Sequence, residues 1–123
     1  MRHVTPDELR DRTTGFAADI VKLARTLRRK PEARNIADQM SDSATAIAAN
    51  YRAVTRARSK REFISKLAIC VEEADETVCW LEIAGRSEIA TAAEVGEFLK
   101  EAREILAILA ASRKTAERGK DNR

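Results

Sequence analysis

Apolar residues recur every three or four positions along four separate stretches of this chain. An α-helix places residues at that spacing on one face, so each stretch predicts a helix with one apolar side. Short connections between such helices favour an antiparallel bundle. The expected fold is therefore all-α, an up-down-up-down four-helix bundle forming one domain over residues 1–117. The expected helices span residues 6–29, 32–56, 60–84 and 92–115. A polar tail is expected over residues 118–123.

Helix boundaries are marked by residues that cap or interrupt helices. A Ser or Thr followed three residues later by Glu forms a capping box, which satisfies amide groups at a helix start. Pro31 suits the first turn of the second helix, and Gly85 suits the end of the third. Gly15 interrupts the first stripe without shifting it, so we expect the helix to continue through it. The capping boxes are Thr5–Glu8, Ser59–Glu62 and Thr91–Glu94.

Composition excludes several classes of protein. The longest apolar run, Ile105–Ala111, has seven residues, against about 20 for a membrane span. Only 4% of residues are aromatic, which argues against single-strand binders that stack bases on aromatic side chains. The first six residues lack the apolar stretch of a secretory signal. Cys70 and Cys79 would lie on opposite sides of one helix, out of reach for a disulfide. We expect a cytoplasmic protein with two reduced thiols.

The usual constellations of catalysis are missing from the sequence. His3 is the single histidine, and it leaves no partner for a Cys–His or Ser–His–Asp arrangement. The four glycines lie too far apart for a phosphate-binding loop. The acidic run Glu72–Glu76 offers carboxylates for a divalent ion, although such runs are usually solvated. We therefore expect a non-enzymatic protein with no catalytic residues, no metal site and no cofactor.

Positive charge is concentrated in the first half of the chain. Residues 1–62 carry 14 basic and 8 acidic side chains, whereas residues 63–123 carry 9 and 12. Up-down topology would place one basic cluster at each end of the bundle. Such clusters contact nucleic-acid phosphates in many proteins, and the alternative is that they only keep the protein soluble. The candidate phosphate contacts are Arg25, Arg28, Arg29, Arg52, Arg56, Arg58 and Arg61.

Two helices carry apolar residues outside their core stripe. A single bundle needs one apolar face per helix, so a second face indicates self-association. Trp80 is the expected anchor, because tryptophan is enriched at interface hot spots; alternatively, its own chain covers it. The candidate interface residues are Ala46, Ala49 and Ala53 on the second helix, with Ile69, Trp80 and Ile83 on the third.

Polar residues also fall near the core edge of the second helix. Buried hydroxyl and amide groups need hydrogen-bond partners. Counting back from the turn near residue 58 places Ser43 opposite the region of Glu73 and Glu76. We therefore expect Ser43, Asn50 and Glu76 to be structural polar residues with a Ser43–Glu76 contact, unless they are simply solvated.

Residues 39–82 carry the pattern of a known family. The segment from Gln39 to Ala53 resembles the family pattern Q-L-x-R-S-A-x-S-I-x-A-N, and Glu73-Ala74-Asp75-Glu76-Thr77 with Trp80-Leu81-Glu82 continues the likeness. The chain resembles bacterial four-helix-bundle proteins first noticed as reading frames in intervening sequences of 23S ribosomal RNA genes. Accessory proteins of diversity-generating retroelements belong to the same broad group.

The resemblance implies a ring-like homopentamer without enzymatic activity. Five copies of a chain with net charge +3 would carry +15. Retroelement relatives engage a reverse transcriptase and structured RNA, so a ribonucleoprotein is the implied partner. Asp42 replaces the usual arginine of the pattern, Ala46 replaces serine and Ala53 replaces glutamate, whereas Ser43, Asn50 and Glu76 keep it. The alternative is a structural or protein-interaction bundle whose charge is only solubilising.

Overall fold

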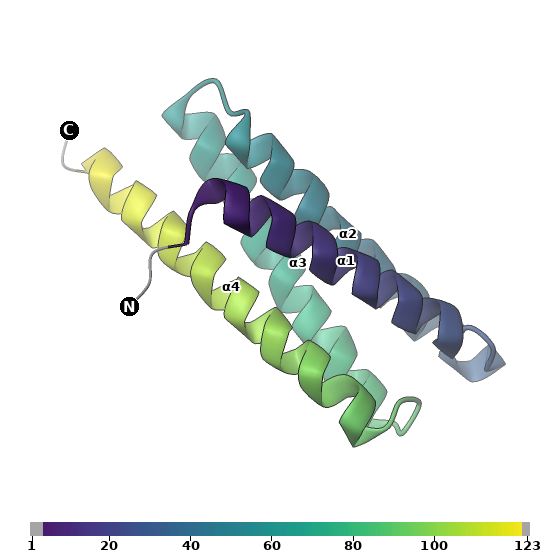
Figure 1. The fold of residues 1–123 in the computed structure, drawn as a ribbon. Coiled ribbons are helices and arrows are strands. Elements are labelled where there is room, and N and C mark those ends of the chain that lie inside the picture. The colour runs from purple at the N-terminus through teal and green to yellow at the C-terminus, as the bar shows by residue number, and fades with distance from the viewer. Residues whose placement is uncertain (1–3, 122–123) are drawn as a thin grey trace.

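The computed structural model describes residues 4–121 and consists there of helices and their connections. Four α-helices follow one another along the chain, and a short 3-10 helix, η1, precedes the second (Figure 1). No strand occurs among the described residues. The all-α expectation is confirmed. The elements are α1 (Pro6–Leu27), η1 (Pro31–Ala33), α2 (Arg34–Thr55), α3 (Lys60–Arg86) and α4 (Ala92–Asp121).

The capping boxes start their helices as predicted. The Thr5 side chain accepts a hydrogen bond from the Glu8 backbone N–H at 3.1 Å, which caps α1. At α4 the exchange is reciprocal. The Glu94 N–H donates to Thr91 Oγ1 at 3.1 Å, and the Thr91 N–H donates to Glu94 Oε1 at 2.9 Å. Ser59 caps α3 in the same way, with the Glu62 N–H at 3.0 Å. Each box satisfies amide groups that the first helical turn leaves unpaired.

Several helix boundaries differ from the expected ones: α1 ends at Leu27 instead of 29, and α2 ends at Thr55 instead of 56. Pro31 opens η1, and the α-helix itself begins only at Arg34. Helix α4 continues to Asp121, six residues beyond the expected end at 115 and into the expected polar tail. The Arg113 side chain donates to Glu117 Oε1 at 2.9 Å, one helical turn further on. Such pairs stabilise a polar helix that has no apolar stripe to extend it.

Gly85 lies inside α3 and does not end it. The helix runs to Arg86, and the residue with positive φ is Glu88, at 63°. A Cβ on Gly85 would lie 3.0 Å from Cγ2 of Val95, the first buried residue of α4. The expectation of a terminating glycine is wrong here, because this glycine lets α4 pack closely against α3.

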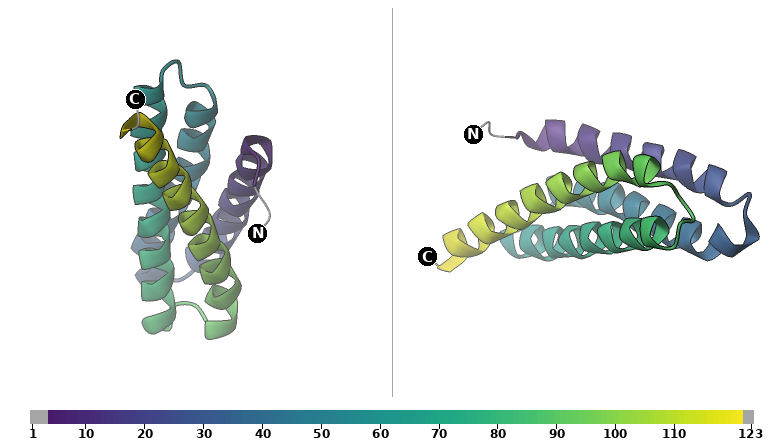
Figure 2. Two further views of the ribbon diagram at one scale, coloured as in Figure 1. Left: turned by 90° about the vertical axis from the view of Figure 1, so that its left-hand side faces the viewer. Right: turned by 90° about the horizontal axis from the view of Figure 1, so that it is seen from below.

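The helices pack in chain order, each antiparallel to the next. Extensive contacts join α1 to α2, α2 to α3 and α3 to α4, whereas α1 and α4 touch sparsely. Figure 2 shows the beginning of α1 and the end of α4 diverging. The bundle is therefore closed on three sides and open along part of the fourth.

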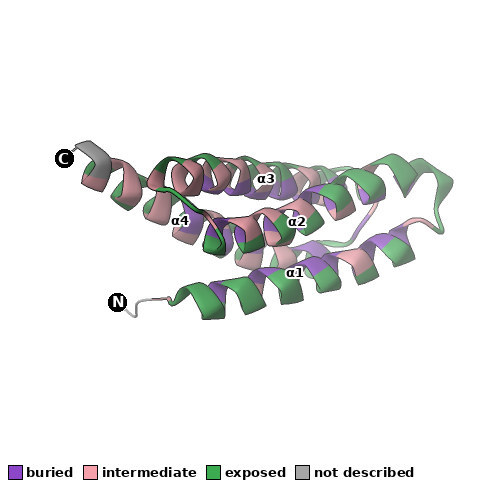
Figure 3. Cartoon of the chain, turned by 90° about the horizontal axis from the view of Figure 1, so that it is seen from above, coloured by how far each residue is buried: buried purple, intermediate pink, exposed green. Residues whose placement is uncertain are grey.

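Buried faces of the four helices point toward one core (Figure 3). Helix α1 contributes Leu9, Phe16 and Ile20 from its predicted stripe, and the stripe continues through Gly15 as expected. Burying side chains of this size stabilises the fold by about 1.5–3 kcal/mol each. The largest apolar side chains that are almost fully buried are Ile20, Met40, Ile47, Leu67, Leu81, Ile105 and Leu109.

Candidate nucleic-acid interface

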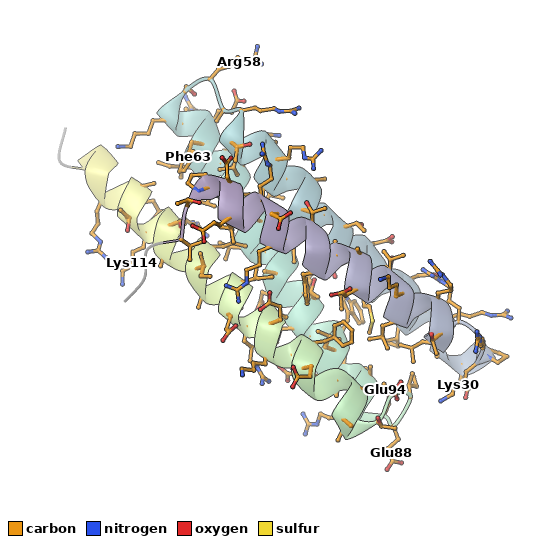
Figure 4. All side chains as sticks on the ribbon, viewed as in Figure 1. Lys30, Arg58, Phe63, Glu88, Glu94 and Lys114 are labelled. Atoms are coloured by element: carbon orange, nitrogen blue, oxygen red, sulfur yellow. The ribbon has the colours of Figure 1, made fainter. Side chains whose placement is uncertain are left out.

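The turn between α2 and α3 carries one of the two arginine clusters. Helix α2 ends at Thr55 and Ser59 starts α3, so the short connection projects from the end of the bundle. Figure 4 shows Arg58 at this tip, pointing away from the helices. Among the described residues, no member of the cluster has an ion-pair partner. The exposed arginines are Arg52, Arg56, Arg58 and Arg61.

The cluster at the opposite end is partly neutralised. Arg25 and Arg29 are exposed, but Arg28 Nε donates to Asp38 Oδ1 at 2.8 Å. Lys30 Nζ donates to the Ile89 carbonyl oxygen at 3.1 Å and so ties the first turn to the third. Two carboxylates lie at this same end, Glu88 in the third turn and Glu94 in the first turn of α4 (Figure 4). The α2–α3 end is the stronger candidate for binding an anion.

The seven candidate arginines do not form one continuous patch on a single chain. Helix α3 has 27 residues and spans about 40 Å at 1.5 Å per residue. The two clusters lie near opposite ends of this length, so one molecule presents two separate basic surfaces. A nucleic acid would have to extend about 40 Å along the bundle to contact both ends of one monomer.

The second apolar face predicted for α2 and α3 exposes less apolar surface than the sequence suggested. Ile83 is the one large apolar side chain among the described residues that counts as exposed, at 38%. Trp80 is half-buried and packs against the core, yet its indole Nε1 is buried without a hydrogen-bond partner. Ile69 is half-buried. The chain therefore covers its tryptophan in part. The small residues of α2 are half-buried at Ala46 and Ala53 and exposed at Ala49.

Ser43 pairs with Thr77 instead of Glu76. The Thr77 hydroxyl lies 2.8 Å from Ser43 Oγ and also 2.8 Å from the Glu73 carbonyl oxygen, while Ser43 Oγ donates to the Met40 carbonyl oxygen at 3.3 Å. Both hydroxyl residues are buried, and Glu76 is exposed. One helical position separates the expected partner from the observed one, and a carboxylate at that position can remain in water.

Asn50 satisfies itself within α2. Its Nδ2 donates to the Ala46 carbonyl oxygen one turn earlier, at 2.9 Å. This local hydrogen bond lets a half-buried amide sit beside the core without a partner from another helix.

An ion-pair cluster between α1 and α4 was not predicted. Arg12 Nε donates to Glu101 Oε2 at 2.8 Å, and Nη2 donates to Glu101 Oε1 at 2.6 Å and to Glu104 Oε2 at 2.8 Å. The hydrogen bond from Arg12 lowers the pKa of Glu101 despite partial burial. The residues lie 89 positions apart in the chain, and charged residues on two amphipathic helices carry no signal for their pairing.

One carboxylate in the acidic run of α3, that of Glu73, is half-buried. Burial raises the pKa of Glu73, and the neighbouring charges of Glu76 and Glu72 raise it further. Asp42, which departs from the family pattern, is exposed. Over the part of the chain that the structure describes, no group of three or more His, Cys, Asp or Glu residues is arranged to hold a metal ion.

Both thiols are free, in contrasting environments. Cys70 is buried against α2, with its Sγ 3.9 Å from the Ile47 carbonyl oxygen, and burial raises its pKa to about 12. Cys79 is exposed. A buried thiol of this kind is a packing residue.

Fold and charge together define a class: a basic antiparallel four-helix protein with arginine-rich ends. Within residues 4–121, no helix combines the length and apolar character needed to cross a membrane. The family model described as 23S rRNA-intervening sequence protein matches residues 8–111, and the chain belongs to this family. The resemblance seen in the sequence is thereby confirmed. No curated protein matches the chain in sequence.

A solved structure supports the same assignment. It is the crystal structure of a protein of unknown function from the S23 ribosomal protein family of Bacteroides thetaiotaomicron. The two chains share 32% sequence identity with a TM-score of 0.83, and the match covers 89% of this chain and 97% of that one. The helical arrangement is therefore shared over nearly the whole of both proteins.

Proposed function

We propose that this protein is a non-enzymatic, homo-oligomeric accessory of the cytoplasm that binds structured nucleic acid, or a ribonucleoprotein, through its arginine clusters. The observation that carries the proposal is the projecting α2–α3 end. Arg52, Arg56, Arg58 and Arg61 are exposed there, without ion pairs among the described residues. Guanidinium groups in this state release counterions when they contact phosphates.

The contacts we propose are to the backbone and carry no base readout. Phosphate contacts fix position on a nucleic acid, whereas sequence is read at base edges. Half-buried Trp80 and buried Tyr51 offer no exposed ring on which a base could stack. We therefore expect binding that depends on the shape and charge density of the nucleic acid more than on its sequence.

Self-association is the second part of the proposal, with a pentamer as the assembly that the family resemblance implies. A chain with net charge +3 has a modest field, and repetition in a ring would multiply it. We place the contact at Ile69, Trp80 and Ile83 with the small residues of α2, because Ile83 is the exposed large apolar side chain in the described part. Native mass spectrometry at micromolar concentration tests this directly, and a monomeric or dimeric mass would contradict it.

The nucleic-acid part is tested with a matched pair of charge-reversed variants. One is Arg58→Glu/Arg61→Glu at the projecting end. The other is Lys100→Glu/Arg103→Glu on α4. It changes the net charge by the same amount, but its residues belong to neither cluster. We expect the first to weaken binding to a labelled RNA hairpin at least tenfold and the second to weaken it less than threefold. Equal losses of RNA affinity in the two variants would show that only the net charge matters. That result would favour the alternative, a structural or protein-interaction bundle whose charge is only solubilising.

A further inference from the structure

A groove lies between the middle of α1 and the first half of α4, two helices that contact each other sparsely. It has a volume of about 520 Å³ and is open to solvent along one side. Arg12 lies in its wall and is already engaged by Glu101 and Glu104. Phe16 and Phe98 supply its apolar lining, whereas the carboxylates in the lining are Asp11, Asp19, Glu97 and Glu101. The groove is thus apolar at its base and negative at its rim.

Gly15 lines this groove in the middle of α1. Glycine is among the weakest helix formers, so a glycine in a helix interior calls for a structural reason. A Cβ added to Gly15 would meet nothing within 4 Å, and the residue has an ordinary helical φ. No contact among the described residues therefore requires a glycine at this position. The space it leaves faces the groove, where a neighbouring molecule could approach the α1 backbone closely.

A surface of complementary shape and charge exists on the same chain. Near its C-terminal end, α2 presents Ala49, Arg52 and Ala53, which are spaced by three and one residues and so share one helical face. Arg56 is the residue that caps the end of this helix. The two alanines are small, and the two arginines are exposed without ion pairs among the described residues. The small alanine side chains would let another helix approach this face closely, and the two arginines give it two positive charges.

We propose that the α1–α4 groove of one copy receives this α2 face of a second copy. The inference rests on the proposed self-association: the small residues of α2 belong to the contact surface proposed above, and the groove is the surface of the neighbouring copy that they meet. A contact between two different surfaces is heterologous, and copies joined in this way can close into a ring. Arg52 and Arg56 supply guanidinium groups to Asp19 and Glu97, and the alanines pass over Gly15. In the assembled protein Arg52 and Arg56 therefore serve the contact between copies, and phosphate binding at this end falls to Arg58 and Arg61, the pair that the RNA test reverses.

Two complementary charge-reversed variants test the contact. The groove variant is Asp19→Arg/Glu97→Arg, and the helix variant is Arg52→Glu/Arg56→Glu. Each places like charges on its two surfaces, so we expect each alone to associate at least tenfold more weakly than wild type in sedimentation and native mass spectrometry. When the two are mixed, both kinds of contact again join opposite charges. We expect mixed oligomers in which the two variants alternate, so any closed ring among them has an even number of subunits.

Controls separate this inference from the functions already proposed. Glu32→Arg/Glu88→Arg adds the same charge at the bundle end and should leave association unchanged, and circular dichroism checks that every variant is folded. A groove variant that associates like wild type, or a mixture that fails to form mixed oligomers, would overturn the groove contact. A monomeric wild type would overturn self-association itself. The groove variant keeps all seven cluster arginines, so its binding to an RNA hairpin reports on the nucleic-acid proposal separately.

Discussion

Gly15 and Gly85 are both helical, yet a methyl group added to each meets different surroundings. At Gly15 there is open space, so Gly15→Ala should raise the free energy of unfolding by about 0.5–1 kcal/mol through helix propensity and a restricted unfolded chain. At Gly85 the new Cβ would lie 3.0 Å from Val95 Cγ2, and crowding of this kind costs about 1–3 kcal/mol. Urea unfolding of dilute protein should rank Gly15→Ala above Gly85→Ala by at least 1 kcal/mol. Equal gains at both positions would contradict the packing argument.

The two cysteines should differ sharply in reactivity. Cys79 is exposed and should react with a thiol reagent in the native protein, whereas Cys70 is buried with its pKa raised to about 12 and should react only after unfolding. Mass spectrometry after timed alkylation reads both sites. Comparable rates at the two thiols would show that the α2–α3 contact opens readily.

Burial of Cys70 also predicts a pH effect with a definite sign. Its folded pKa of about 12 exceeds the ordinary 9.0, so the protonated thiol contributes stability fully below pH 9, and this contribution is lost as pH rises toward 12. Cys70→Val lacks the ionisation. Its stability should fall less steeply than that of wild type over this window, as measured by urea unfolding at a series of pH values. Parallel curves would contradict the assignment.

Residue-level details were predictable where the physics is local. The capping boxes pair residues three positions apart, and the structure confirms all three. The role of Gly85 was not predictable, because it depends on Val95 of the next helix. Ser43 met Thr77 instead of Glu76, since helical spacing fixes a partner's neighbourhood but leaves an uncertainty of one position.

At the scale of elements, the Arg12 cluster joins the two helices that otherwise touch least. Arg12 and Glu101 side chains are 32% and 33% exposed, so solvent screens the pair in part. Its bidentate geometry still favours a coupling energy of about 1 kcal/mol in a double-mutant cycle of Arg12→Ala and Glu101→Gln. The matched control is Arg103→Ala, which removes an exposed pair with Glu82 at 3.5 Å and should change stability little. A coupling energy near zero would mean that this ion pair adds nothing to the contact between α1 and α4.

The same pair predicts an acid effect. Arg12 lowers the pKa of Glu101, so the carboxylate contributes stability that is present above its unfolded pKa near 4.5 and lost as pH falls through the lower folded value. Arg12→Ala should flatten the stability curve below pH 4.5 relative to wild type. Identical acid slopes would contradict the assignment.

Helices themselves were predictable because their stripes and caps agree with each other. The exact end of α4 was not, since the polar residues beyond 115 fit a helix stabilised by Arg113–Glu117 as well as a tail. The groove was also beyond sequence reasoning, because it arises from how far α1 and α4 diverge. Amphipathic patterns determine which face is buried and leave the separation of two helices open.

At the scale of the whole molecule, charge placement followed from topology. Up-down helices put the first and third turns at one end and the second turn at the other, as Figure 4 shows for Lys30 and Arg58. The pairing of Arg28 with Asp38, which neutralises part of the first cluster, could not be predicted from the sequence, because it depends on side-chain geometry across a turn. We therefore assign most phosphate contact to the α2–α3 end.

The most direct measurement of that claim is the affinity of the wild-type protein for a labelled RNA hairpin across a salt series. Phosphate contacts predict that the logarithm of the association constant falls linearly with the logarithm of salt concentration, with a slope of about −0.7 to −0.9 per phosphate neutralised. We expect the slope of the wild-type protein to correspond to at least two phosphates neutralised, and we expect a shallower slope for Arg58→Glu/Arg61→Glu. No binding at low salt, or an affinity independent of salt, would contradict a nucleic-acid role for the arginine clusters.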